Sequence, residues 1–218
     1  VRDYNEMTIL NNTSNVAQEF RQLLLPKRLD KFSSIDVDAY FRKQHGVCSD
    51  YYDIIVHKDR IFAIVLDVAG QSAQAVIIMI MIRAILYLIT NTDESLDSII
   101  DWLNKGITGK VGIDHFSTVS LLCYYPQFSR LEAVVAGNHS MILYRSKTKE
   151  VEVFHHKSDP IGIDIHSKYK SLSYDLGKGD IVSVYTDGIS TMLDKDGKLF
   201  KIDELAHLIA KKGEYSAK

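Results

Sequence analysis

The sequence predicts an α+β fold in which two antiparallel β-sheets stack face to face and are flanked by helices, an αββα sandwich. Three observations support this class. Short strand-like segments cluster in the second half of the chain, two internal helical segments do not alternate regularly with strands, and short polar turns such as RSKTKE separate neighbouring strands. Strands joined by such turns are expected to form antiparallel hairpins.

Composition narrows the class of protein. The chain has 218 residues, of which 46% are hydrophobic, and a formal net charge of -2, which is typical of a soluble globular protein with a sizeable core. Mixed charge signs do not provide the basic surface that a nucleic-acid partner requires. Cys48 and Cys123 are far apart in the sequence, so neither a disulfide framework nor a cysteine metal site is expected, and a cytoplasmic location fits best.

Residues 1–25 are predicted to form an N-terminal helical linker that ends at Pro26. Its apolar positions follow a 4-3-4-3 spacing, which is typical of a short coiled-coil stripe: Ile9, Thr13, Val16, Phe20 and Leu23. Two interpretations remain open. The helix packs on its own domain, or it forms a homodimer with a second copy.

Strand-like patterns follow the linker. Residues 35–41 alternate loosely, residues 51–57 form a second segment, and residues 61–66 are a continuous apolar run typical of a strand covered on both faces. The turn HKDR between the last two segments predicts a hairpin.

Residues 73–89 form a long apolar segment that approaches the length of a membrane span. Arg83 lies inside it, and a central arginine opposes insertion by roughly 2.5 to 3.5 kcal/mol. We therefore predict a buried helix with Arg83 on its water-facing side and no membrane insertion. A second helix is predicted over residues 95–105, where apolar residues mark one face.

The second half of the chain is rich in strands and closes with a helix over residues 202–212. Strands are predicted over residues 117–124, 131–136, 141–144, 151–155, 171–175 and 181–185.

Three aspartates occupy strand ends. Asp50 begins the strand SDYYDI, Asp67 ends IFAIVLD, and Asp187 ends IVSVYTDG. A carboxylate at the end of an apolar strand is costly unless it is paired or holds a metal, and Mg²⁺ or Mn²⁺ is held by sets of carboxylate oxygens. Each aspartate alone also fits a turn or a helix cap. Together they indicate a candidate metal site.

These aspartates lie in strings that resemble a known family. HGVCSDYYDI, LDVAGQSAQAVIIMIMIRAIL, FSTVSLL, VAGNHSMILYR, DPIGI, GDIVSVYTDGIS and DGKLF follow the order of GGDYYD, GDVSGKG, FVT, AGHPP, LGL, LYTDG and DGELFG. The latter strings characterise the SpoIIE/RsbU branch of the PPM (protein phosphatase 2C-type) metal-dependent serine/threonine phosphatases. The resemblance covers about residues 16–212, so residues 26–218 are expected to form the phosphatase domain.

The resemblance implies a mechanism and a site. Asp67 would bridge two Mn²⁺ or Mg²⁺ ions beside the backbone carbonyl of Val68, Asp50 would serve one ion, and Asp187 would serve the other. Two such ions orient a phosphate and activate water, so no side-chain nucleophile is needed. The implied substrate is a phosphoserine or phosphothreonine on a small bacterial regulator of sigma factors, such as a phosphorylated STAS-type anti-anti-sigma protein.

Departures from the family pattern define an alternative function. Cys48 and Ser49 replace Gly-Gly, Gln71 and Ser72 replace Lys-Gly, and His139 comes one position later than the family histidine. The resemblance also implies a further helix and a closing strand with an Asp-Asp pair that is not found after Asp187. Two explanations remain open: the phosphatase domain is cut short at its C-terminal end in this sequence, or the protein lacks a complete second metal site. The alternative is a weak or inactive pseudophosphatase that binds a phosphoprotein. With either function the chain is expected to be cytoplasmic. It is either a cytoplasmic protein by itself or the cytoplasmic part of a larger sensor protein.

Overall fold

The structure is a computed structural model that describes part of the chain. The described residues are Glu19, Leu29 and residues 23–26, 31–42, 49–70, 73–110, 116–155, 157–193 and 197–213. Most of the predicted helix over residues 1–25 lies outside them, as do Cys48, Gln71 and Ser72. Leu24 and Leu25 are described, and they pack against the larger of the two hydrophobic cores of the molecule.

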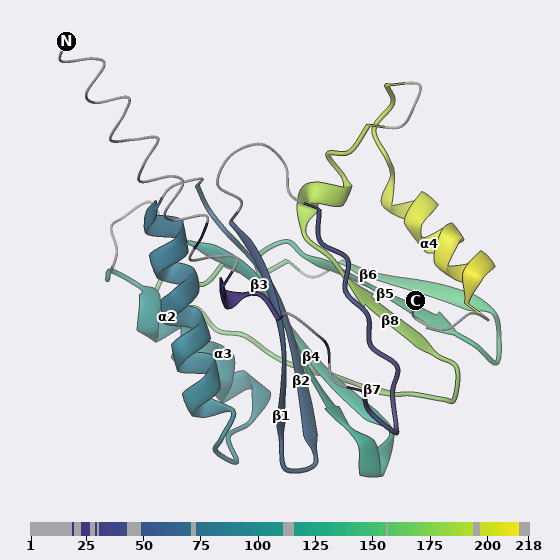
Figure 1. Cartoon of the computed structure of the whole chain (residues 1–218), viewed down its shortest axis with the longest axis horizontal. Helices are drawn as coiled ribbons and strands as arrows, with labels where there is room; N and C mark the ends of the chain where they lie inside the picture. Colours follow the sequence, from purple (N-terminus) through teal and green to yellow (C-terminus); the bar gives the residue numbers. More distant parts are fainter. Residues whose placement is uncertain are drawn as a thin grey trace.

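Two antiparallel sheets form the centre of the molecule (Figure 1). The larger sheet has the order β1-β2-β3-β4-β7, with bounds β1 Asp50–His57, β2 Arg60–Val68, β3 Ser117–Tyr125, β4 Arg130–Ala136 and β7 Leu172–Asp175. The smaller sheet has the order β6-β5-β8, with bounds β5 Ser140–Arg145, β6 Glu150–His155 and β8 Ile181–Val184. The chain crosses from the larger to the smaller sheet between β4 and β5.

Helices cover the outer faces of the sheets. Figure 1 shows α2 (Ala73–Ile89) and α3 (Leu96–Ile107) beside the larger sheet, and α4 (Ile202–Lys212) beside the smaller one. Short 3₁₀ turns occur at Pro126–Phe128 and Asp187–Ile189. The predicted αββα class is confirmed.

Two cores follow from the alternation of side chains along β2 and β3. Phe62 and Leu121 face α2 and α3 and belong to the larger core, whereas Ile61 and Leu122 face the smaller sheet, where they pack with Met141 of β5. Each core strand therefore buries both faces, as the apolar run at residues 61–66 predicts.

The structure corrects one expectation and adds detail to another. Residues 35–41 alternate between half-buried and exposed, as expected, but they form no strand, because no described segment pairs with them. Ile35 packs instead against the smaller core, which lies between the two sheets. Arg83 keeps 34% of its side chain exposed, beside the exposed Tyr87, but it also reaches a buried group. Its Nε donates to the Tyr51 hydroxyl at 2.9 Å and lies 3.6 Å from Asp53, a buried carboxylate that requires a neighbouring cation.

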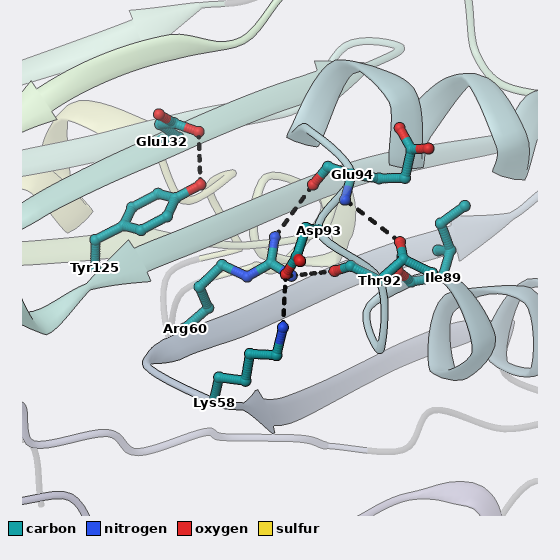
Figure 2. A network of polar contacts seen from close by, with 8 residues as sticks. All are labelled: Lys58, Arg60, Ile89, Thr92, Asp93, Glu94, Tyr125 and Glu132. Carbon is teal, nitrogen blue, oxygen red and sulfur yellow. Dashed lines mark hydrogen bonds and ion pairs between the residues drawn. The ribbon is translucent and has the colours of Figure 1, made fainter.

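The turn between β1 and β2 is tied to the connection between α2 and α3 (Figure 2). The buried guanidinium of Arg60 donates to the backbone oxygens of Glu94, at 3.1 Å, and Thr92, while Lys58 pairs with Asp93 at 2.9 Å. These contacts fix the end of the hairpin against the helical layer. Among the described residues, no helix is both long and apolar enough to cross a bilayer.

Candidate carboxylate site between the sheets

Asp50 and Asp67 lie directly opposite each other at one end of the β1–β2 pair. Residues paired across two antiparallel strands point to the same face of the sheet, so both carboxylates face the smaller sheet, as Ile61 does farther along β2. Like charges in this arrangement repel each other. The pair therefore needs hydrogen-bond donors or a cation.

Asp67 receives one such donor but remains electrostatically unfavourable. The Ser49 hydroxyl donates to its Oδ1 at 2.9 Å, and the Ser117 hydroxyl donates to its backbone oxygen at 2.9 Å. Burial, together with the charges of Asp50 and Asp187, raises the pKa of Asp67 to about 6, although the Ser49 bond opposes this shift. A raised carboxyl pKa among other carboxylates is typical of a functional site.

Asp187 enters the site from the smaller sheet. It begins the 3₁₀ turn after β8, where its side chain is exposed, and its charge contributes to the raised pKa of Asp67. The preceding residue, Thr186, donates from Oγ1 to Oδ2 of Asp50 at 3.0 Å. This bond links the end of β8 to the start of β1, and it brings the three predicted aspartates to the same end of the molecule.

Thr118 and His139 were not predicted as site residues. Thr118 lies on β3 directly opposite Asp67, and Nε2 of the buried His139 lies 2.8 Å from its hydroxyl. Nδ1 of the same ring lies 3.0 Å from the Ser120 hydroxyl, and burial lowers the pKa of His139 to about 4, against the opposing charge of Asp187. Two sequence signals covered these residues, the threonine in FSTVSLL and the shifted histidine in VAGNHS, but neither reveals that the two side chains are in contact.

The donor chemistry fits a hard divalent cation, because Asp50, Asp67 and Asp187 supply only oxygen atoms and repel one another. Val68 ends β2 with its side chain fully buried, so its backbone is firmly placed beside Asp67. Within the described ranges, however, no three His, Cys, Asp or Glu side chains are close enough together to hold an ion. Asp50 and Asp67 thus form the core of a candidate metal site, with Asp187 farther out.

The fold and the site together define an αββα protein with a carboxylate cluster where the two sheets meet. Residues 57–218 match the family described as Stage II sporulation protein E (SpoIIE), and the chain belongs to this family. The match includes Asp67, Val68 and Asp187, whereas Asp50 precedes it.

Individual relatives agree with this assignment. The chain is 23% identical over 188 residues to the phosphoserine phosphatase RsbU of Bacillus subtilis, a match that covers 86% of this chain and 56% of RsbU. The SiaA-PP2C domain of Pseudomonas aeruginosa shares the fold with a TM-score of 0.65 and 18% identity, covering 76% of this chain and 67% of that one. RsbX in complex with magnesium is similar with a TM-score of 0.58 and 20% identity, covering 78% of this chain and 83% of that one.

Proposed function

We propose that this chain is the catalytic domain of a PPM-type protein serine/threonine phosphatase. The observation that carries the proposal is the direct pairing of Asp50 with Asp67, in a position where the nearby charge of Asp187 helps to raise the pKa of Asp67. Such a cluster of like charges costs stability and is retained where it binds a cation.

The proposed roles follow the placement of the side chains. Asp50, Asp67, the backbone carbonyl of Val68 and Asp187 would hold Mn²⁺ or Mg²⁺. Thr186 and Ser49 orient the two strand carboxylates through their hydroxyl groups. When bound, the ions supply a Lewis acid and an activated water for attack on a phosphate ester. The magnesium complex of the similar protein RsbX supports this choice of ion.

The proposed substrate is a phosphoserine or phosphothreonine on a small regulatory protein, such as a phosphorylated STAS-type anti-anti-sigma protein. The relative RsbU is a phosphoserine phosphatase, but this chain spans only 56% of its length. We further propose that residues 1–25 act as a linker able to form a homodimer, that residues 26–218 form the phosphatase domain, and that the protein acts in the cytoplasm.

One observation favours a second function, that of a pseudophosphatase. Because no three metal-binding side chains are assembled in the described part of the chain, the site has the character of an incomplete centre. A protein with such a site would bind the phosphorylated partner and release it unchanged.

Hydrolysis of p-nitrophenyl phosphate with increasing Mn²⁺ tests the proposal. We expect Mn²⁺-dependent turnover, and a loss of roughly 10³-fold in kcat/KM for Asp67→Asn, because the variant loses one charge from the ion-binding cluster. Asp93→Asn is the matched control, since this exposed carboxylate pairs with Lys58 at the turn between β1 and β2; it should retain full activity.

Calorimetry separates the two functions. A phosphatase binds Mn²⁺ and dephosphorylates a phosphoserine peptide, whereas a pseudophosphatase binds the peptide without releasing phosphate. If the wild-type chain neither binds Mn²⁺ nor releases phosphate, the phosphatase proposal is wrong.

A further inference from the structure

The hydroxyl of Thr118 is held beside the carboxylates by a buried imidazole. Thr118 and Asp67 are cross-strand partners, so their side chains share the face that points toward the smaller sheet. His139, on the crossing from β4 to β5, contacts the Thr118 hydroxyl with Nε2 at 2.8 Å and is only 5% exposed. Thr118 itself is half-buried, so its hydroxyl lies between a fixed protein partner and the site.

Gly137 holds the other side of Thr118. Its φ of +96° lies in the left-handed region, and a Cβ at this position would lie 2.5 Å from Cγ2 of Thr118. The methyl group of Thr118 thus packs against a bare backbone while its hydroxyl contacts His139. These two contacts restrain both substituents of Thr118 in the observed rotamer.

The hydrogen bonds of His139 leave part of the hydrogen-bonding capacity of Thr118 unused. A neutral imidazole has one N–H donor and one acceptor nitrogen, and His139 uses both, one on Thr118 and the other on Ser120. A hydroxyl has one donor proton and two acceptor lone pairs. When Nε2–H of His139 donates to Thr118 and Nδ1 accepts from Ser120, the Thr118 proton stays free to donate to an acceptor such as a phosphoryl oxygen. Ser120 is 1% exposed and lies deeper between the sheets, where no ligand reaches it.

We propose that Thr118 binds a phosphoryl oxygen of the substrate and that His139 is a positioning residue that acts through Thr118. The inference rests on the proposed phosphatase function and names a binding group within it. Ser120 anchors the far nitrogen of the imidazole, and Gly137 provides the space that the Thr118 rotamer requires.

Two amide substitutions of His139 distinguish positioning from simple structural support. The amide of glutamine extends as far from the backbone as Nε2 and can reach Thr118, whereas the amide of asparagine extends only as far as Nδ1 and can reach Ser120. We therefore expect His139→Gln to stay within about threefold of wild type in kcat/KM, and His139→Asn to lose about tenfold, the loss expected for one hydrogen bond to a charged group. If His139 served stability alone, both variants would lose activity in proportion to their unfolded fraction.

Inhibition by inorganic phosphate provides the specific readout. Thr118→Val keeps the shape of the side chain but removes the hydroxyl, and it should weaken phosphate inhibition about tenfold without changing the affinity for Mn²⁺. Thr92→Val is the matched control, because it makes the same substitution at the connection between α2 and α3, beside the opposite end of the β1–β2 hairpin; it should change phosphate inhibition by less than about twofold. The double variant Thr118→Val/His139→Asn should be no worse than either single variant.

The outcomes separate this inference from the proposed function. If the wild-type chain binds Mn²⁺ and phosphate by calorimetry and Thr118→Val binds both equally well, Thr118 does not contact the phosphoryl group and the inference is wrong, while the phosphatase proposal stands. Equal losses in His139→Gln and His139→Asn also overturn it. If the wild-type chain binds neither Mn²⁺ nor phosphate, the proposed function fails and the inference fails with it.

Discussion

The two ends of the β1–β2 hairpin carry opposite electrostatic arrangements. At the open end, Asp50 faces Asp67, and the nearby Asp187 adds a third negative charge. At the turn, Lys58 pairs with Asp93, and Arg60 donates to backbone oxygens of the connection between α2 and α3 (Figure 2). The same two strands therefore hold a cluster of repelling charges at one end and a set of paired charges at the other.

This difference separates function from stability along one hairpin. Paired charges at the turn hold the sheet against its helices, whereas the carboxylates raise the free energy of the folded state when no cation is bound. Substitutions at the turn should therefore lower stability without affecting chemistry. Substitutions at the carboxylates should remove chemistry and, without metal, increase stability.

The largest stability effect is expected at Arg60. Arg60→Met retains an apolar side chain over Phe62 but loses the bonds to Thr92 and Glu94, so it should lower the free energy of unfolding by about 2 kcal/mol. For a chain of this size that corresponds to a decrease in Tm of about 4 to 8 °C, measurable by circular dichroism.

Lys105→Met is the control for this loss. Lys105 forms an exposed pair with Asp101 within α3, and such i,i+4 pairs contribute about 0.3 to 0.5 kcal/mol. A similar Tm for the Arg60 and Lys105 variants would show that the turn does not hold the helical layer.

The next effect, of opposite sign, is expected at Asp67 in the metal-free protein. In Asp67→Asn the introduced amide would still accept the hydrogen bond from Ser49 but would not repel Asp50, so the variant should increase the free energy of unfolding at about pH 7.5 by about 1 kcal/mol after allowance for solvent screening. Mn²⁺ should reverse the order, because it stabilises only the wild type by binding to the folded state.

The pH dependence of this gain identifies its cause. The pKa of Asp67 is raised to about 6 in the folded chain from about 4 in the unfolded one, so the folded state binds more protons between these values. The contribution of Asp67 to stability is therefore lost as the pH rises from about 4 to 6, and the advantage of Asp67→Asn should appear over that interval. An advantage that is constant from about pH 4 to pH 8 would show that charge repulsion is not its source.

The sequence predicts the local elements and one half of the site. Helix α4 occurs at the predicted residues 202–212, where apolar residues recur on one face, and α2 occurs at residues 73–89, where the apolar run is nearly continuous. The pairing of Asp50 with Asp67 follows from the two-residue turn at Lys58. This turn pairs His57 with Arg60, and every following pair, out to Asp50 and Asp67, is then fixed by the antiparallel register. Local pattern is sufficient wherever the partner is close in sequence.

The contribution of the second sheet could not be predicted in the same way. His139 contacts Thr118 only because the chain crosses between the sheets after β4, and no periodicity in the sequence encodes that crossing. Similarly, the extended segment at residues 35–41 shows strand-like alternation, but pairing requires a neighbour that a local pattern does not reveal. Contacts between sheets depend on tertiary packing rather than on local propensity.

The smallest effect on stability is expected at Lys58, because its ion pair at the turn is exposed, unlike the buried guanidinium of Arg60. Lys58 and Asp93 are 57% and 82% exposed, so water screens their attraction and the ordering of two mobile side chains opposes it. Lys58→Met should therefore change Tm by no more than about 1 °C in low salt, and the difference should disappear in about 1 M NaCl, where the screening length is about 3 Å. A salt-independent loss as large as that of Arg60→Met would mean that the exposed ion pair, rather than the buried guanidinium and its carbonyl partners, holds this end of the hairpin to the helices.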